Sequence, residues 1–380
     1  MSEPVIITAK RTAIGKVGGM FSLVPPEQLV SPLIKNILEE TSLDPREVDD
    51  VILGNATGPG GNLARLSALE ADLPFSVPGV TVDRQCGSGL EAIQMAARFV
   101  QAGAGEVYLA GGVESSSTAP WKIEKPTDLY YPAGPSIFTK ARFSPEKIGD
   151  PGMGQAAENV AERYGISRKD QDEYAFYSHQ KATEAIENGR FKEEIVPIQG
   201  IVQDECVRWN TSIEKLADLP PVFKEHGTVT AGNACPINDG AALVLIMSKE
   251  KAKALGLDPV LTFKDSACCG VDPHYLGIGP IPAVTRLLGK QDLQVDDIDT
   301  VEFNEAFASQ VLASIHYLSI PIEKVNRGGG AIALGHPYGA SGAILVTRLF
   351  HEMRSANFKR GLATLGIGGG MGLAVLFEFG

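Results

Sequence analysis

Cys86 is the residue of this chain whose setting best suits covalent chemistry. It follows the apolar run Gly79-Val-Thr-Val82 and precedes a segment whose apolar residues recur at helical spacing. The cysteine therefore stands at a predicted strand-to-helix turn. Because a helix N-terminus offers unpaired amide donors and a positive partial charge, we expect the pKa of this thiol to lie below its ordinary value of about 8.5. A cysteine merely packed in a tight turn is the alternative.

A histidine that could activate this thiol lies near the other end of the chain. His336 stands in a glycine-studded loop, Gly328 to Gly342, that opens another apolar helical run. A neutral imidazole can accept the thiol proton when the two groups come within hydrogen-bond reach. The other histidines are expected to be surface or structural residues: His179, His226, His274, His316 and His351.

Two further segments could stabilise a developing oxyanion. Asn304 ends a strand-like run, and a carboxamide there can donate to an oxyanion directly or hold a water against it. Gly368 belongs to the run Gly366-Ile-Gly-Gly-Gly-Met-Gly372, whose bare amides could form an anion-binding nest. A cap for the asparagine and a tight turn for the glycines are the alternatives.

The elements that must position these residues are duplicated. Residues from Pro32 and from Pro282 run in parallel at a constant offset of 250, and both copies have the pattern of helix, short loop and strand. Further along, the copies drift out of register, but the Cys86 and His336 motifs keep the same order. Such alternation predicts βαβ units, whose sites gather at the carboxyl ends of the strands. If the two halves are related by an approximate two-fold axis, the loops that carry the four candidate residues would meet at one crevice. These residues are Cys86, Asn304, His336 and Gly368.

Composition narrows the class of protein. The chain has 380 residues, 44% of them hydrophobic, and 46 acidic against 34 basic residues give a net charge of −12. Because this charge repels nucleic acids and anionic membranes, neither is an expected partner. No basic leader or membrane-length apolar run is seen, which predicts a soluble, non-secreted, cytoplasmic protein. Five cysteines without a CxxC or Cys/His metal pattern argue against a disulfide framework or a metal site.

Taken together, the motifs resemble those of the thiolase family across nearly the whole chain. Four motifs agree in order: Asp83-Arg-Gln-Cys-Gly-Ser-Gly-Leu with the nucleophile turn, Asn304-Glu-Ala-Phe with NEAF, Gly335-His-Pro-Tyr-Gly with GHP, and Gly368-Gly-Gly370 with the last glycine loop. The resemblance implies an α/β protein of the thiolase fold. We expect duplicated βαβ-type halves with mixed five-stranded sheets in a layered α/β/α/β/α arrangement, plus an inserted loop domain.

The expected domains follow from the repeat and the resemblance. Residues 1–117 with 236–258 would form the N-terminal half, and 259–380 the C-terminal half. Residues 118–235 would form the inserted loop domain, with a helical stretch from Gln155 to Gly189, and would contribute to coenzyme A binding and oligomer contacts. A homodimer or homotetramer is implied.

The resemblance also assigns chemistry. It implies that Cys86 is acylated by an acyl-CoA or 3-ketoacyl-CoA with His336 as its activating base, in ping-pong turnover. Asn304, through a water, and His336 would form one oxyanion site, and the amides of Cys86 and Gly368 the other. Coenzyme A and acyl-CoA would be substrates, with no tightly bound cofactor. Substrate-binding positions carried over from the family are Arg208, near the adenine nucleotide, and Met153, Ala234, Cys235 and Leu276 along the pocket.

The chain departs from the family pattern at the carbon–carbon step. Thiolases carry a second reactive cysteine before the last glycine loop, and here that position is Gly366. Cys235 stands where a serine is usual, so it could supply the missing acid/base group or be a passive replacement. Three functions therefore stay open: an acyl-CoA C-acyltransferase, an acyltransferase or hydrolase without carbon–carbon chemistry, and a weakly active acyl-CoA-binding or complex-forming protein.

Overall fold

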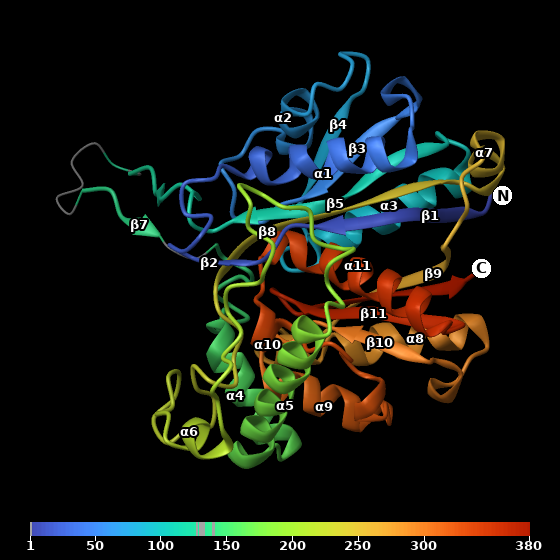
Figure 1. Cartoon of the computed structure of the whole chain (residues 1–380). Helices are drawn as coiled ribbons and strands as arrows, with labels where there is room; N and C mark the ends of the chain where they lie inside the picture. The colour runs from blue at the N-terminus through green and yellow to red at the C-terminus, as the bar shows by residue number, and fades with distance from the viewer. Residues whose placement is uncertain (1, 127, 129–133, 139–140) are drawn as a thin grey trace.

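A single mixed sheet of ten strands runs through the protein (Figure 1). The computed structural model describes residues 2–126, 128, 134–138 and 141–380. The strand order is β10-β11-β12-β9-β1-β8-β5-β3-β4, with β2 beside β8. The strands are β1 (Pro4–Arg11), β2 (Gly15–Lys16), β3 (Asp50–Gly54), β4 (Gly79–Val82), β5 (Val107–Ser115), β8 (Asn238–Ser248), β9 (Leu261–Gly270), β10 (Thr300–Phe303), β11 (Arg360–Ile367) and β12 (Met371–Phe379).

The two halves of this sheet repeat one topology. The order β1-β8-β5-β3 in the first half is matched by β9-β12-β11-β10 in the second. The helices preceding β3 and β10, α1 (Pro26–Thr41) and α8 (Pro280–Gln291), end at Ser42 and Asp292, both left-handed with φ 50°. Helix α3 (Ser88–Ala102) and helix α11 (Tyr338–Ala356) also begin 250 residues apart. The offset of 250 residues therefore also relates the turns that carry Cys86 and His336.

The expected duplicated halves are present, and their sheets join at one edge. Strands β1 and β9 pair at Val5 with Thr262 and at Ile6 with Leu261, which joins the halves into one sheet. The second half contributes four strands, and an isolated bridge from Val301 to Val325 stands where β4 pairs with β3 in the first half. The joining is physically favourable because an edge strand has unpaired backbone groups, and two edges that meet can satisfy each other.

Helices lie on both faces of the sheet and between its halves. Helices α1 and α2 (Leu63–Glu70) pack against the first half, and α8 and α9 (Ala308–Leu318) against the second. Helices α3 and α11 contact strands of both halves and form the central layer (Figure 1). Residues 339–350 of α11 are all buried, as expected for a helix apolar on every side.

The region between the halves contains several short elements: β6 (Lys122–Ile123), β7 (Ile137–Phe138), α4 (Met153–Tyr164), α5 (Arg168–Glu187) and α6 (Ile213–Ala217). The helical stretch expected from Gln155 to Gly189 is two helices, because Gly165 adopts a left-handed conformation that ends α4. The remaining helices are α7 (Lys249–Leu255) and α10 (Ala331–Leu334). None of the described helices is long and apolar enough to cross a membrane.

A buried arginine ties this inserted region to β1. Arg11 is fully buried and donates through Nη1 and Nη2 to the two carboxylate oxygens of Asp204, at 2.7 and 3.0 Å. Its Nε donates to Glu194 at 2.8 Å. Although burial lowers the pKa of Arg11, the two carboxylates raise it further, so the side chain stays charged.

We expect Arg11→Met to destabilise the protein by about 3–5 kcal/mol, because two buried carboxylates lose their counterion. Urea unfolding measures this loss. The matched control is Lys35→Met, which removes an exposed pair with Asp72 and should cost no more than about 1 kcal/mol. A loss below about 1 kcal/mol for Arg11→Met would contradict the prediction.

Candidate active site

Cys86 lies on a constrained turn between β4 and α3. The preceding residue, Gln85, has φ 48°, a left-handed conformation that is uncommon for residues other than glycine. The hydroxyl of Ser88 donates to the Gln85 carbonyl at 2.6 Å and accepts from the Arg84 amide at 2.8 Å. These bonds fix the turn, so the cysteine is presented beside the first turn of α3.

The pKa of Cys86 moves opposite to the sequence expectation. Burial raises it to about 11, and hydrogen bonds from the Gly368 amide and from the amide of Cys86 itself offset only part of that rise. The side chain is 7% exposed. The helix terminus was expected to dominate, but the loss of water around a buried sulfur costs the thiolate more. The resting group is therefore a thiol that needs a base.

His336 is held as a neutral base. Its Nδ1 lies 2.6 Å from the Ser341 hydroxyl, which itself donates to the Pro337 carbonyl at 3.0 Å. The serine proton is thus committed, so we assign the imidazole proton to Nδ1 and the free lone pair to Nε2. Burial lowers the pKa of His336 to about 3. The backbone amide of His336 donates to Asn238 at 2.8 Å, which fixes the loop.

Close packing of two helices brings these residues together. A Cβ added to Gly89 of α3 would lie 2.8 Å from the Gly339 carbonyl of α11, and one added to Gly342 would lie 2.4 Å from the Leu90 amide. Both contacts are too short for any side chain, so the glycines let the N-terminal ends of α3 and α11 converge. Cys86 and His336 each lie two residues before their helix, at equivalent positions of the repeat.

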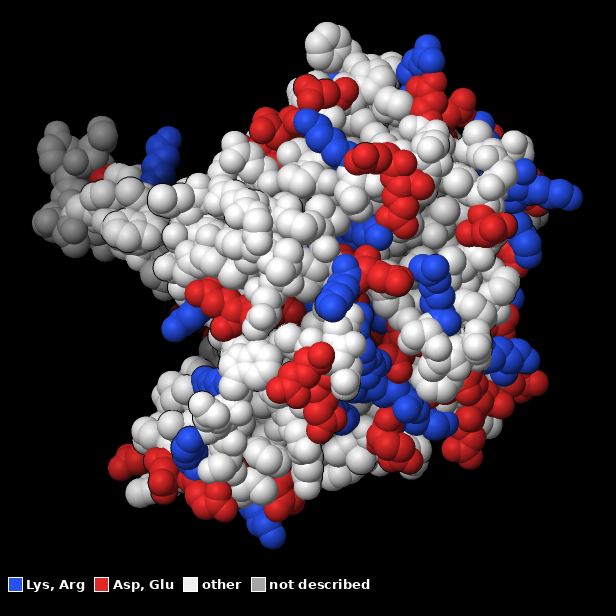
Figure 2. All heavy atoms as spheres, viewed as in Figure 1, with Lys and Arg blue, Asp and Glu red and all other residues white. Residues whose placement is uncertain are grey.

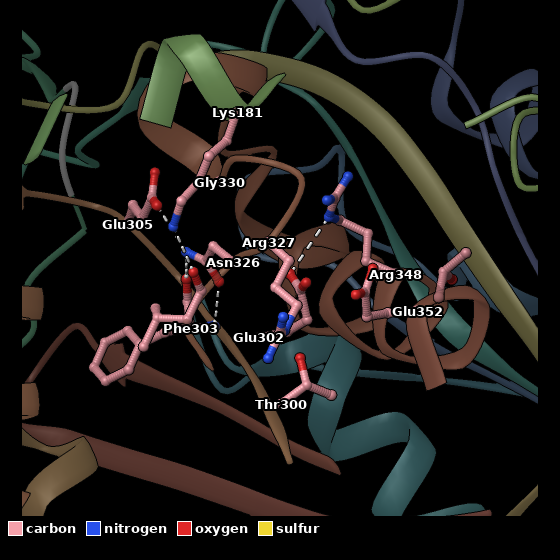
Figure 3. A network of polar contacts seen from close by, with 12 residues as sticks. Lys181, Thr300, Glu302, Phe303, Glu305, Asn326, Arg327, Gly330, Arg348 and Glu352 are labelled. Atoms are coloured by element: carbon pink, nitrogen blue, oxygen red, sulfur yellow. Dashed lines mark hydrogen bonds and ion pairs between the residues drawn. The ribbon is translucent and has the colours of Figure 1, made fainter. Parts of the chain in front are cut away.

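Asn304 is positioned by its neighbours after β10. Its Nδ2 lies 3.4 Å from Nε2 of His336, and its backbone amide donates to the Thr364 carbonyl. Asn326 brackets the preceding residue: its Oδ1 accepts from the Phe303 amide at 2.7 Å and its Nδ2 donates to the Phe303 carbonyl at 2.8 Å (Figure 3). The carboxamide therefore faces the free face of the imidazole from a fixed backbone.

Glu305 anchors the same loop to the inserted region. Its carboxylate accepts hydrogen bonds from the hydroxyls of Tyr174 and Ser178, both on α5, and from Nδ2 of Asn326 and the Ile332 amide. Figure 3 shows Glu305 and Asn326 together beside Lys181 of the same helix. Because every oxygen of this buried carboxylate is satisfied, the loop that bears Asn304 is rigid.

The last glycine loop follows β11 and reaches Cys86 through the Gly368 amide. Gly369 and Gly370 have φ 86° and 83°, which only glycine adopts without strain. At Gly366, a Cβ would lie 3.2 Å from the Gly277 carbonyl and 3.4 Å from the Leu276 carbonyl. Leu276 is buried, and its backbone lines the place where a side chain at 366 would begin.

Cys235 lies on another wall of the same site. The residue as a whole is partly exposed, but burial of its thiol raises the thiol pKa, and the thiol interacts electrostatically with Cys86. Its amide donates to the Ala306 carbonyl at 3.0 Å, next to the Asn304 loop. Met153 and Ala234 pack with Cys235 against one apolar cluster, whose buried members are Ala157, Val229, Ala306 and Phe307.

Arg208 is exposed and does not contact Cys86 or His336. Its Nη2 donates to the Ala231 carbonyl at 3.0 Å, and its amide donates to Nδ1 of buried His179 at 3.2 Å. That bond requires an unprotonated Nδ1. Burial, with the Arg208 charge nearby, lowers the pKa of His179 to about 4. His179 is buried, and His351 is half-buried with its Nε2 3.0 Å from the Ala9 carbonyl.

This depressed pKa predicts a pH-dependent stability. Below the unfolded value of about 6.5 the unfolded chain binds a proton at His179 that the folded protein refuses, so stability falls as pH drops toward 4. Between pH 6.5 and 4.5, wild type should lose roughly 2 kcal/mol more than His179→Gln in urea unfolding. His226→Gln, on an exposed side chain, is the control. Parallel pH profiles for wild type and His179→Gln would refute the assignment.

Several positioning residues escaped the sequence reasoning. Ser341 lies in the loop from Gly328 to Gly342, and its spacing of five residues from His336 could have suggested a contact. Asn238, Asn326 and Glu305 carry no such signal, because each meets its partner through the tertiary fold.

Comparisons with known proteins show which proteins this chain is similar to. Residues 4–250 match the model for the thiolase N-terminal domain, and 257–379 that for the thiolase C-terminal domain. A Staphylococcus epidermidis protein named "Putative acetyl-CoA C-acetyltransferase VraB" is 51% identical over 100% of this chain and 99% of its own. A Staphylococcus aureus protein of the same name is 49% identical over 99% of both chains. The crystal structure of the Bacillus anthracis acetyl-CoA acetyltransferase superposes with a TM-score of 0.92, at 40% identity, covering 100% of this chain and 99% of that one.

Proposed function

Because the chain belongs to the thiolase family, we propose that it is an acetyl-CoA C-acyltransferase that forms or cleaves 3-ketoacyl-CoA through an acyl group on Cys86. The observation that carries the proposal is the placement of Cys86 and a neutral His336 at the adjoining starts of α3 and α11, with the Gly368 amide on the sulfur.

The proposed acylation begins with proton transfer from Cys86 to Nε2 of His336. Each group alone resists charging, since burial raises the pKa of the thiol and lowers that of the imidazole. Charging both in one step replaces two isolated charges by an ion pair, which the low-dielectric site favours. The sulfur then attacks the substrate carbonyl. Amides of Cys86 and Gly368 would receive the thioester oxygen of the acyl-enzyme, and Asn304, through a water, would act with His336 at the second oxyanion site.

Substrate binding is proposed along the inserted region. Met153, Ala234 and Cys235 share one apolar cluster beside the Asn304 loop, which suits the pantetheine arm of coenzyme A. Arg208 is exposed beyond this wall and would meet the adenine nucleotide, and Leu276 would border the acyl group. Coenzyme A and its thioesters would bind as substrates, with no tightly held cofactor.

One alternative has a specific observation in its favour. Gly366 removes the usual acid/base group, so the protein could transfer or hydrolyse acyl groups without carbon–carbon chemistry. A catalytically weak acyl-CoA-binding or complex-forming protein is the third possibility. Cys235 is a candidate for the missing group, since its thiol interacts with Cys86, although a passive serine-to-cysteine replacement would look the same.

One assay separates these functions. Purified protein is mixed with acetoacetyl-CoA and free coenzyme A, and both loss of substrate and the intact mass of the protein are followed. Thiolysis supports the C-acyltransferase, and acetylation of Cys86 without thiolysis supports the second function. If the protein shows neither thiolysis nor acetylation of Cys86, both enzymatic functions are refuted. Full thiolysis by Cys235→Ser would exclude Cys235 as the second acid/base group.

A homodimer or homotetramer is also proposed. Strands β6 and β7 project from the body (Figure 1), and the part of this arm that Figure 2 does not draw in grey is mostly white, with blue Lys or Arg atoms at its upper edge. Trp121 is 85% exposed, and Ile123, Ile137 and Phe138 are exposed beside it. Exposed apolar residues on a projecting arm are typical of an oligomer contact. Light scattering of wild type and of Trp121→Ser would test it: a smaller assembly in the variant supports the arm contact.

A further inference from the structure

Tyr338 is the one residue between Ala331 and Phe350 that is not buried. It opens α11 two residues after His336, and its ring meets the imidazole edge-on with centroids 5.0 Å apart. The ring also packs beside the core cluster that contains Cys86 and Ile367. Because Tyr338 is partly exposed within an otherwise buried segment, we infer that its side chain reaches the space in front of His336 and Cys86.

The hydroxyl of Tyr338 is available for a ligand. It interacts electrostatically with the two cysteines of the site, Cys235 and Cys86, and with Glu114. No protein group in the described part of the chain forms a hydrogen bond with it. A half-buried phenol without a partner is a donor that the protein leaves unsatisfied until something binds.

The carbon–carbon step requires a proton at a place where this chain has no cysteine. When 3-ketoacyl-CoA is cleaved, the bond between C2 and C3 breaks and C2 of the departing acetyl-CoA must gain a proton. Gly366 offers none. We propose that Tyr338 is a further catalytic residue, whose phenol delivers this proton to C2 in cleavage and removes it in condensation. The inference rests on the proposed C-acyltransferase function.

The proton balance closes with the substrates alone. In cleavage, Cys86 sulfur bonds to C3, the electron pair of the C2–C3 bond moves to C2, and the Tyr338 O–H proton passes to C2. His336, which took the proton of Cys86, then returns a proton to the phenolate. A phenolate whose conjugate acid has a pKa near 10 is more basic than an imidazole near 6.5, so the return transfer is downhill. The neutral imidazole accepts the thiol proton of incoming coenzyme A, whose sulfur attacks the acyl-enzyme, and passes that proton to the released Cys86 thiolate.

Its electrostatic setting suits an acid that starts protonated. Burial, together with the neighbouring thiols, raises the pKa of Tyr338 well above its ordinary value. Cys235 is the competing donor, because its thiol also interacts electrostatically with Cys86. Unlike Cys235, Tyr338 packs its ring directly against the imidazole of His336, which accepts the Cys86 proton.

Tyr338→Phe tests the assignment, because it keeps the ring against His336 and removes only the hydroxyl. Three readouts are compared: acetylation of Cys86 by acetyl-CoA, deuterium exchange at C2 of acetyl-CoA in D2O, and thiolysis of acetoacetyl-CoA. We expect exchange and thiolysis to fall by about 10²-fold or more, with acetylation unchanged within about threefold. Tyr317→Phe, on an exposed tyrosine of α9, is the matched control.

Rescue sharpens the test. Adding Gly366→Cys to Tyr338→Phe should restore exchange and thiolysis, since a Cβ there needs its neighbours to shift by only a few tenths of an ångström. The assignment is overturned if Tyr338→Phe keeps thiolysis within about threefold, if acetylation of Cys86 falls equally, or if only Cys235→Ser loses exchange. Wild type that neither acetylates Cys86 nor cleaves acetoacetyl-CoA would instead refute the proposed function itself.

Discussion

Cys86→Ala is expected to lower acetoacetyl-CoA thiolysis by about 10⁴-fold or more, because no other group replaces a covalent nucleophile once it is removed. The acetyl adduct should disappear from the intact mass in the same variant. Stability should change little, since the side chain is small and alanine keeps its Cβ in the turn beside α3.

The matched control for this variant is Cys269→Ala. Cys269 is a partly buried cysteine on β9 that packs against the outer cluster of the second half, away from Cys86. It should keep both the adduct and the rate within a few-fold of wild type. If Cys86→Ala is still acetylated, or if Cys269→Ala is not, a residue other than Cys86 carries the acyl group.

The raised pKa of Cys86 changes how its reactivity is understood. A thiolate stabilised in advance by a helix terminus would react with any electrophile that reached it. Here burial keeps the sulfur protonated until a substrate occupies the site and His336 can take the proton. The Gly368 amide contributes in both stages, first on the sulfur and then on the oxygen that develops beside it.

Much of the fold was predictable from one internal regularity. The offset of 250 between Pro32 and Pro282 indicated the duplication, and the structure extends it to Ser88 and Tyr338 at the starts of α3 and α11. What the sequence could not provide was the joining of β1 to β9, since two edge strands carry no signal about which edge they will meet. Their pairing depends on how the halves pack.

The candidate site was predictable in its residues but less so in its energetics. The motifs around Cys86, Asn304, His336 and Gly368 marked the segments, and the fold places them at adjoining loops. The pKa of Cys86 was predicted with the wrong sign, because burial depends on the whole surrounding structure and a helix terminus is visible in sequence. Glu305 and its partners on α5 were also missed, since the contact joins segments about 130 residues apart.

His336→Ala should lower kcat/KM for thiolysis by about 10³–10⁴-fold, since it removes both the base for Cys86 and a donor to the second oxyanion site. Acetylation of Cys86 should slow by a similar factor at pH 7. Raising the pH should recover part of this acetylation in the variant, as the thiol with pKa about 11 begins to ionise without help. His316→Ala, on an exposed side chain of α9, is the control.

The pH dependence of the wild-type rate should also reflect the lowered pKa of His336. Because burial lowers the pKa of His336 to about 3, protonation of this imidazole cannot cause a loss of activity between pH 7 and 5. An acid limb near pH 6.5 that vanished in His336→Ala would mean that the imidazole titrates as if solvated. The paired hydrogen bonds of Ser341 and Asn304 argue against that state, since a protonated Nε2 would face the Asn304 amide donor at 3.4 Å. The site therefore uses histidine as a base that is always ready, and leaves the timing of proton transfer to the arrival of substrate.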